Sequence, residues 1–241
     1  MQHSNFQTIR FVVILSVIVS LLLSFASTQL KSMQVFNMEL DKKKNILKSI
    51  GLNFSGLNSD AIIAKYNERI TEVIIDMEGI VDTKVDFNDL ISIENKATGE
   101  MKYNIDKKEF LPAYISSSPK AFIFPISGKG LWGTLYGYFA LSEDHNTVMG
   151  ITFYDHKETP GLGGEVEKEW FQNNFVGKKI FNDLGELVSI TVAKGKASDV
   201  FKANEIKHGV DGISGATITS KGVTTFLKRD LNKYKKYFMN N

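Results

Sequence analysis

Residues 121–156 read AFIFPISGKGLWGTLYGYFALSEDHNTVMGITFYDH, in which aromatic and β-branched runs alternate with glycine-rich or polar turns. The runs AFIFPI, TLYGYFAL and TVMGITFYDH each have the composition of a strand. Glycine-spaced aromatic strands of this kind predict neighbouring strands of a mixed or antiparallel sheet. Helical and strand patterns alternate elsewhere in the chain without a βαβ rhythm, so we expect an α+β fold.

The segments around this sheet predict a mixture of short elements. Residues 58–70 (NSDAIIAKYNERI) predict a helix with Asn58 or Ser59 as its N-cap. TEVIIDMEG and DLISIENK predict short strands, as do residues 186–195 (ELVSITVAKG), whereas two prolines predict an irregular passage in residues 111–119 (LPAYISSSP). A short helix is expected after ETPGLGG, carrying Val166, Trp170 and Phe171.

The carboxyl-terminal residues predict an amphipathic helix that begins near Thr217. Apolar side chains recur there at three- and four-residue steps, with lysine and aspartate on the other face. The recurring positions are Val223, Leu227, Leu231, Tyr234 and Phe238.

The amino-terminal region contains an uncharged apolar run at residues 11–30 (FVVILSVIVSLLLSFASTQL). As a helix it would span about 30 Å, the thickness of a bilayer core. A retained single-pass anchor is the favoured interpretation, and a signal peptide cleaved near Ser24 and Ala26 is the alternative. The lysines that follow the run favour a cytoplasmic body, although large domains cross membranes largely regardless of such charges.

The composition excludes several classes of function. The 241 residues are 43% hydrophobic and 23% charged, with a net charge of +2, which is typical of a globular chain and gives no basic surface for nucleic acid. Cysteine is absent, and no two of the four histidines have the spacing of a metal motif. We therefore expect no metal site.

The run DGISGATITSKG, residues 211–222, places several hydroxyl side chains at the start of the terminal helix. Ser214 or Thr217 could simply cap the helix. A capped helix needs one hydroxyl, whereas a bound phosphate would use several, together with the free backbone N–H groups and Lys221. The spacing is not that of a P-loop.

Two further glycine-rich loops could contribute to a site. HKETPGLGG, residues 156–164, combines a rigid Thr-Pro step with a flexible turn, and Leu162 at its tip would be exposed or packed on a flat ligand. GKGLWG, residues 128–133, presents Trp132 either to the core or as a stacking surface. His156 and Glu158 could form an acid–base pair, but no nucleophile is linked to them, so no catalytic side chain is predicted.

Together these three runs resemble the family of C subunits of sodium-translocating NADH:quinone oxidoreductases. Residues 211–217 match the D-x-x-[ST]-G-A-[ST] flavinylation motif of FMN-binding domains, and HxETPGLG and GKGLWG occur in the same order in that family. The G subunit of RNF-type electron transport complexes shares the ETPGLG and SGAT elements and is the nearest alternative. An anchored, exported binding protein for a phosphorylated ligand is an alternative of a different class.

The resemblance implies a covalent flavoprotein. It implies that Thr217 carries FMN as a phosphoester, near Asp211 and Lys221 and with Ser214, Gly215 and Ala216 as phosphate donors. It also implies a flat slot for the flavin ring, for which our candidates are Trp132, Glu158, Thr159, Pro160, Leu162 and Gly163.

The resemblance further implies a place in a respiratory complex. The implied partners are the other subunits of that complex and a flavin transferase that uses FAD, and the implied role is an electron relay between NADH oxidation and quinone in a sodium-pumping complex. We expect a cytoplasmic stub (1–10), a transmembrane helix (11–30), a helical and short-strand part (31–110) and an FMN-binding domain (111–241). The resemblance places the body on the periplasmic side of a bacterial inner membrane, and we follow it over the lysine count.

Overall fold

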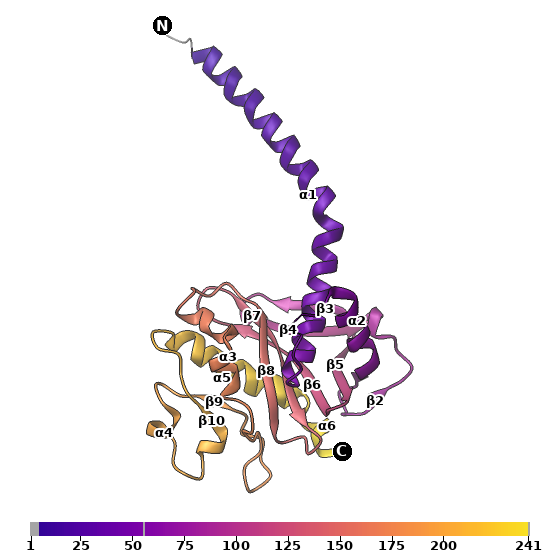
Figure 1. Ribbon diagram of the computed structural model, residues 1–241, viewed down its shortest axis with the longest axis vertical. Helices are drawn as coiled ribbons and strands as arrows, with labels where there is room; N and C mark the ends of the chain where they lie inside the picture. Colours follow the sequence, from indigo (N-terminus) through magenta and orange to yellow (C-terminus); the bar gives the residue numbers. More distant parts are fainter. Residues whose placement is uncertain (1–4, 55, 241) are drawn as a thin grey trace. The chain divides into compact units, whose positions relative to one another are not determined.

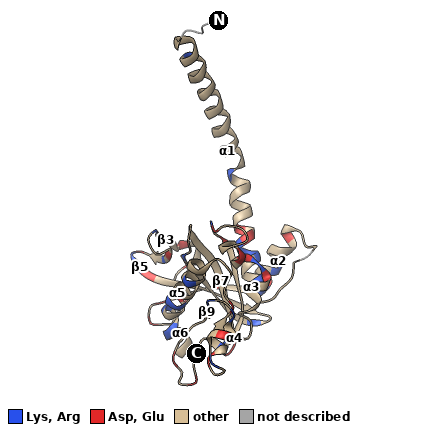
Figure 2. Cartoon of the chain, turned by 90° about the vertical axis from the view of Figure 1, so that its left-hand side faces the viewer, with Lys and Arg blue, Asp and Glu red and all other residues tan. Residues whose placement is uncertain are grey.

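The structure is a computed structural model that describes residues 5–54 and 56–240. It divides into two compact units, Met1–Asp41 and Lys42–Asn241. The described part of the first unit belongs to helix α1 (Asn5–Ser49), which contains an 18-residue window of mean hydropathy 2.6 with none of its residues buried. No charged side chain lies between Arg10 and Lys31 (Figure 2), so length and composition allow this helix to cross a membrane.

The second unit is built on an antiparallel sheet with strand order β2-β1-β5-β6-β7-β8, to which a β3–β4 hairpin is joined through β4 and β5. A separate parallel pair, β9 and β10, lies outside this sheet (Figure 1). The strands are β1 (Ile70–Ile75), β2 (Val81–Asp82), β3 (Ile91–Asn95), β4 (Glu100–Ile105), β5 (Lys108–Ser117), β6 (Lys120–Lys129), β7 (Thr134–Ser142), β8 (Val148–Asp155), β9 (Thr191–Val192) and β10 (Gly209–Val210).

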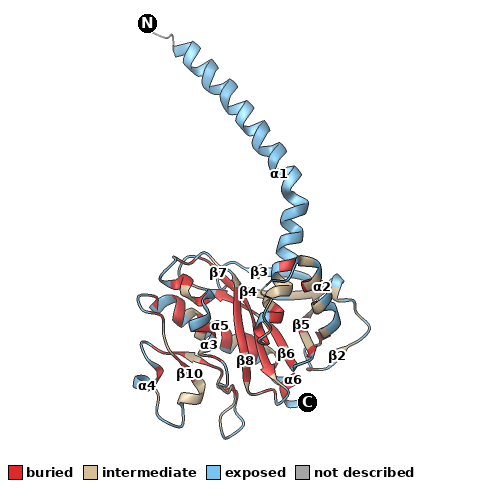
Figure 3. Cartoon of the chain, in the orientation of Figure 1, coloured by how far each residue is buried: buried red, intermediate tan, exposed pale blue. Residues whose placement is uncertain are grey.

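Short helices connect and cover these strands. They are α2 (Ser59–Arg69), η1 (Phe87–Asp89), η2 (Gly163–Glu167), α3 (Glu169–Asn173), α4 (Ala197–Val200), η3 (Ile206–His208), α5 (Thr217–Lys233) and α6 (Lys235–Asn240). Strands β6 to β8 are the most completely buried part of the sheet (Figure 3).

Strand β8 shows how the sheet is covered on both faces. Ile151 and Phe153 belong to the main core that also contains the apolar side of α5. Gly150 and Thr152 alternate with them and meet the end of α1 within the second unit, because Thr152 Oγ1 donates to the Asn45 carbonyl at 3.1 Å. A side chain at Gly150 would place its Cβ 2.5 Å from the Ser49 carbonyl oxygen, so only glycine permits this approach.

Helix α5 packs directly on β6 through two glycines. A Cβ at Gly222 would lie 2.3 Å from the carbonyl oxygen of Lys129, and a Cβ at Gly128 would lie 2.2 Å from the Phe226 side chain. Helix and strand backbones therefore approach each other more closely than any larger residue would allow. These contacts fix the distance between the first part of α5 and strand β6.

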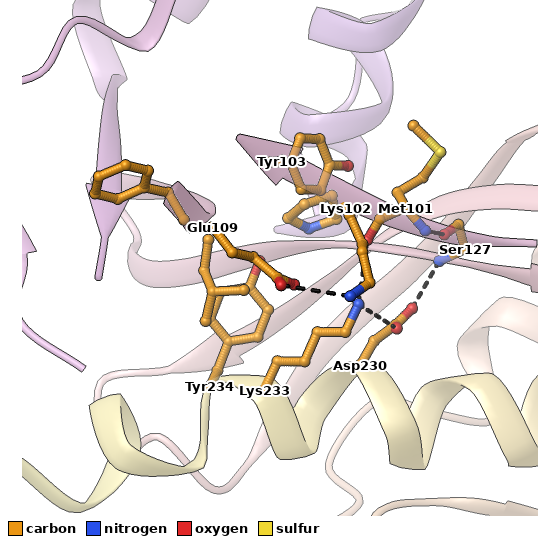
Figure 4. A pocket seen from close by; sticks show the side chains of 11 residues that line it. Met101, Lys102, Tyr103, Glu109, Ser127, Asp230, Lys233 and Tyr234 are labelled. Carbon is orange, nitrogen blue, oxygen red and sulfur yellow. Dashed lines mark hydrogen bonds and ion pairs between the residues drawn. The ribbon is translucent and has the colours of Figure 1, made fainter. Parts of the chain in front are cut away.

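A buried carboxylate fixes the same helix further along (Figure 4). Asp230 Oδ2 accepts the N–H of Ser127 at 2.9 Å, and its Oδ1 pairs with Arg229 Nε at 2.9 Å and with Lys233 Nζ at 3.6 Å. Burial raises the pKa of Asp230, and the neighbouring cations only partly offset this. The adjoining cavity, about 10 Å³, holds at most about one water molecule and is not a ligand site.

The expected α+β architecture, with a long apolar amino-terminal helix, a mixed or antiparallel sheet and carboxyl-terminal helices, is confirmed. Asn58 is the N-cap of α2, where its side chain accepts the Ala61 N–H at 2.9 Å. The terminal helix begins at Thr217 as expected. The recurring apolar positions are all buried: Val223, Leu227, Leu231, Tyr234 and Phe238.

Three local predictions were wrong. Residues 111–119 are not irregular, since β5 runs through Pro112, which pairs with Ile74 and lies between the segments of β5 that pair with β4 and β6. The missing N–H falls where β5 changes partners, so the strand tolerates it. Residues 186–195 form only the short β9, which pairs with β10 in a separate two-stranded sheet instead of joining the main sheet. The helix expected to carry Val166, Trp170 and Phe171 is split, and Val166 lies in η2.

Candidate functional site

The start of α5 has no side-chain cap. Its N-cap is Ala216, which makes no side-chain hydrogen bond, and the preceding Gly215 turns the chain with φ +73. The expectation that Ser214 or Thr217 caps the helix is therefore wrong. Because the first residues of a helix have no intrahelical acceptor for their N–H groups, those of Thr217, Ile218 and Thr219 are available to an anion.

The structure assigns different environments to the four hydroxyl groups. Ser214 and Thr217 are exposed. Thr219 is buried and donates to Glu158 Oε2. Ser220 is also buried, and its Oγ has no hydrogen-bond partner within the described chain. Of these four hydroxyl groups, Thr217 is therefore the exposed one that belongs to α5, and Ser220 is an unsatisfied polar group one turn above the helix start.

An open groove of about 660 Å³ borders this helix start. It is lined by the start of α5 with the preceding turn, by the segment 191–196, which we call the lysine loop, and by Trp170 of α3. The lining residues are Trp170, Thr191, Val192, Ala193, Lys194, Gly195, Lys196, Asp211, Gly212, Ile213, Ser214, Gly215, Thr217, Ser220, Lys221 and Thr224.

Asp211 holds the lysine loop in place. Its Oδ1 accepts the N–H of Ala197 at 2.7 Å, and the N–H of Gly212 donates to the carbonyl of Gly195 at 2.8 Å. Asp211 is the single carboxylate among the groove-lining residues, and they include three lysines, Lys194, Lys196 and Lys221. The groove therefore carries an excess of positive charge and suits an anionic ligand.

Glu158 connects the other two glycine-rich loops to α5. Its buried carboxylate accepts the N–H groups of Leu131 at 3.1 Å and Trp132 at 2.8 Å, as well as the hydroxyl of Thr219. Burial alone would raise the pKa of Glu158, but the hydroxyl and backbone donors outweigh it and hold that pKa below its ordinary value. The ionised Glu158 therefore links the loop at Leu131 and Trp132 to Thr219 of α5, and it is not the acid of an acid–base pair.

Exposed apolar side chains occur at the start of α5 and on the two glycine-rich loops. Trp132 is 67% exposed, Ile218 58% and Leu162 43%. Leu162 packs against the turn before α5, since a Cβ at Gly215 would lie 2.8 Å from its Cδ2. The structure thus places Trp132 as a surface residue and not in the core, which leaves its stacking face accessible.

The predicted site residues fall into two groups. Asp211, Ser214, Gly215, Thr217 and Lys221 line the groove, with Ala216 buried beneath them. The slot candidates lie outside its lining, and Trp132 borders a separate hollow of about 350 Å³. These candidates are Trp132, Glu158, Thr159, Pro160, Leu162 and Gly163. Two of them nevertheless reach the start of α5, because Glu158 contacts Thr219 and Leu162 contacts Gly215.

Sequence reasoning missed Trp170, Ser220, Thr224 and the lysine loop. Ser220 was within the quoted motif but had no signal that distinguished it from the other hydroxyls. The lysine loop overlaps the end of residues 186–195, which were predicted as one strand, so its pair of lysines gave no separate signal.

The fold and the site define an FMN-binding domain that follows, along the chain, a helix long enough to span a membrane. The FMN-binding domain family matches residues 130–232. The C subunit of the Na(+)-translocating NADH-quinone reductase of Haemophilus ducreyi is 37% identical over 92% of this chain and 87% of that protein. The Pseudomonas aeruginosa C subunit is 32% identical over 96% and 93%.

A crystal structure of the Parabacteroides distasonis C subunit is similar with a TM-score of 0.71 and 34% identity, over 88% of this chain and 98% of that one. Shewanella oneidensis NqrC shares the fold, with a TM-score of 0.62. The chain belongs to the family of C subunits of the Na(+)-translocating NADH-quinone reductases.

Proposed function

We propose that this chain carries FMN as a phosphoester on Thr217 and relays electrons as a subunit of a sodium-translocating NADH:quinone reductase. Membership of the family supports the flavin and the multisubunit complex. The observation that carries the residue assignment is the exposed hydroxyl of Thr217 at the uncapped start of α5, beside a basic groove.

The residues around Thr217 fit a phosphate. The N–H groups of Ile218 and Thr219 and the partial positive charge of the helix start would face it. Lys221 lies one turn further on and lines the same groove, and Ser220 Oγ supplies an unused donor. A phosphate attached to Thr217 would therefore satisfy groups that the protein alone leaves unpaired.

The loops next to Thr217 fit a flat ring. Trp132 and Leu162 present exposed apolar surface, and Thr159 and Pro160 form the rigid step before Leu162. Glu158 fixes the Trp132 loop relative to α5. Gly163 permits the approach of Glu158 and Thr219, because a Cβ at Gly163 would lie 2.5 Å from Glu158 Oε2 and 2.6 Å from Thr219 Oγ1. Bound FMN would supply the one-electron chemistry, and these side chains would orient the ring and limit its contact with water.

The maturation partner and the membrane orientation belong to the same proposal. A flavin transferase would form the ester from FAD, and the domain would face the periplasm of a bacterial inner membrane. Since the chain has no cysteine, Lys202→Cys would introduce a single thiol. Labelling of that thiol by a membrane-impermeant maleimide in intact cells would support the periplasmic orientation, and labelling only after lysis would contradict it.

Covalent flavin is tested by coexpressing the full chain with a flavin transferase and measuring flavin fluorescence on a denaturing gel. We expect a fluorescent band that disappears in Thr217→Ala and persists in the matched variant Thr225→Ala, which changes an exposed threonine of the same helix outside the groove lining. Loss of the signal in Thr219→Ala alone would identify a different acceptor. Flavin that is released on denaturation would contradict the ester and favour a reversible binding protein.

A further inference from the structure

The basic groove carries more positive charge than the mature ester requires. A phosphodiester between Thr217 and riboflavin has a single ionised oxygen, and the helix start and Lys221 already face that position. Lys194 and Lys196 line the same groove and add two further cations. Because like charges brought together without a counterion repel one another, this excess points to a ligand with more than one phosphate.

The chemistry of ester formation requires such a ligand. FMN alone is a poor donor, since attack by the Thr217 hydroxyl would have to expel an oxide from its phosphate. In a flavin dinucleotide the leaving group is a second phosphate, which departs readily with the adenosine half. Two adjacent phosphates must therefore lie at Thr217 while the ester forms, although only one remains afterwards.

We propose that the lysine loop binds the second phosphate of the flavin dinucleotide and stabilises it as it leaves. This inference rests on the proposed ester at Thr217. The Thr217 oxygen forms a bond to the phosphorus that carries riboflavin, and the bond from that phosphorus to the bridging oxygen breaks. The bridging oxygen leaves with the electron pair as part of AMP. The hydroxyl proton passes to a base of the transferase or to water.

Two further observations support a built site. Ser220 Oγ is buried, has no partner within the described chain and belongs to the groove lining, so it is a free donor for a polar group in the groove. The lysine loop is also held by Asp211 and by the Gly212–Gly195 hydrogen bond, so its position relative to α5 is set before any ligand binds. Preorganised cations of this kind stabilise charge that develops on a leaving group.

The test compares the transfer kinetics of full-length variants in detergent, with purified flavin transferase and FAD. The double variant Lys194→Gln/Lys196→Gln removes both cations, and Lys202→Gln is the matched control, since Lys202 is an exposed lysine six residues after Lys196 and outside the groove lining. We expect kcat/KM for covalent flavin incorporation to fall about tenfold in the double variant, which is about 1.4 kcal/mol. AMP should also inhibit its flavinylation less strongly than that of the wild type.

Further readouts separate this role from others. Long incubation should bring the double variant to the wild-type amount of flavin, with an unchanged melting temperature and visible spectrum. A wild-type rate in the double variant, or an equal loss in Lys202→Gln, would overturn the proposal. A changed flavin spectrum with an unchanged rate would also overturn it, since the lysines would then act on the mature flavin. Absence of covalent flavin from the wild type would instead refute the proposed function.

Discussion

Gly222→Ala tests whether the close approach of α5 to β6 holds the start of the helix in position. Taken alone, replacing a helical glycine with alanine should stabilise the helix by about 1 kcal/mol. In this structure the new Cβ would lie 2.3 Å from the Lys129 carbonyl oxygen. Ordinary C···O contacts are about 3.3 Å or longer, so helix and strand would have to separate by roughly 1 Å.

The cost of that separation exceeds the gain in helix propensity. Val223, Phe226 and Leu227 follow Gly222 and are at most 2% exposed, so a shift of α5 disturbs the main core. Overpacking of a close-packed core costs typically about 1–3 kcal/mol, and a backbone oxygen yields less readily than a side chain. We expect a net destabilisation of about 2 kcal/mol, or a fall of about 4–8 °C in melting temperature for a domain of this size.

Urea unfolding of the full chain in detergent, followed by circular dichroism, measures this free energy. Lys228→Ala is the matched control, because Lys228 is exposed on the same helix, and its stability should change by less than about 0.5 kcal/mol. A Gly222→Ala protein as stable as the wild type, or more stable, would refute the reasoning. It would mean that α5 does not lie as close to β6 as the Gly222–Lys129 contact indicates.

The remaining predictions concern polar groups around the same helix. Glu158→Gln should lose about 2 kcal/mol at pH 7. Because the folded-state pKa of Glu158 is lowered, the stability that its ionised form contributes is complete above the ordinary glutamate pKa of about 4.3 and is lost as the pH falls through the folded value. The free energies of unfolding of the two proteins should therefore converge in acid. A gap between their urea midpoints that does not narrow would contradict this. Asp230→Ala should cost about 3 kcal/mol in urea unfolding, since it leaves Arg229 and the Ser127 N–H without their buried acceptor, and a loss below about 1 kcal/mol would show the cluster to be dispensable. Ser220→Ala should leave the melting temperature of the flavin-free protein unchanged or slightly higher, because its Oγ has no partner within the described chain, yet reduce the stabilisation that covalent flavin adds; equal gains in both proteins would contradict a contact with the flavin.

The sequence by itself determined the features that depend on local patterns. Apolar spacing located the membrane-length helix and the helix from Thr217, and glycine-spaced aromatic runs located β6, β7 and β8. The three glycine-rich runs indicated a flavin site through their resemblance to a known family, which is visible in sequence because the residues of each motif are contiguous. Local reasoning failed at Pro112, where a central strand tolerates proline only because its neighbours change there.

Only the tertiary structure decided how the four hydroxyl groups of residues 211–222 are used. Thr219 is occupied by Glu158, 61 residues away, and no local pattern reports such a distant partner. Gly222 matters because of a carbonyl on β6, and Asp211 because it orders a lysine loop to which no simple spacing rule connects it. Chain packing buries Thr219 and Ser220 and leaves Ser214 and Thr217 exposed. Of these two, Thr217 stands at the uncapped start of the helix, beside a groove with excess positive charge.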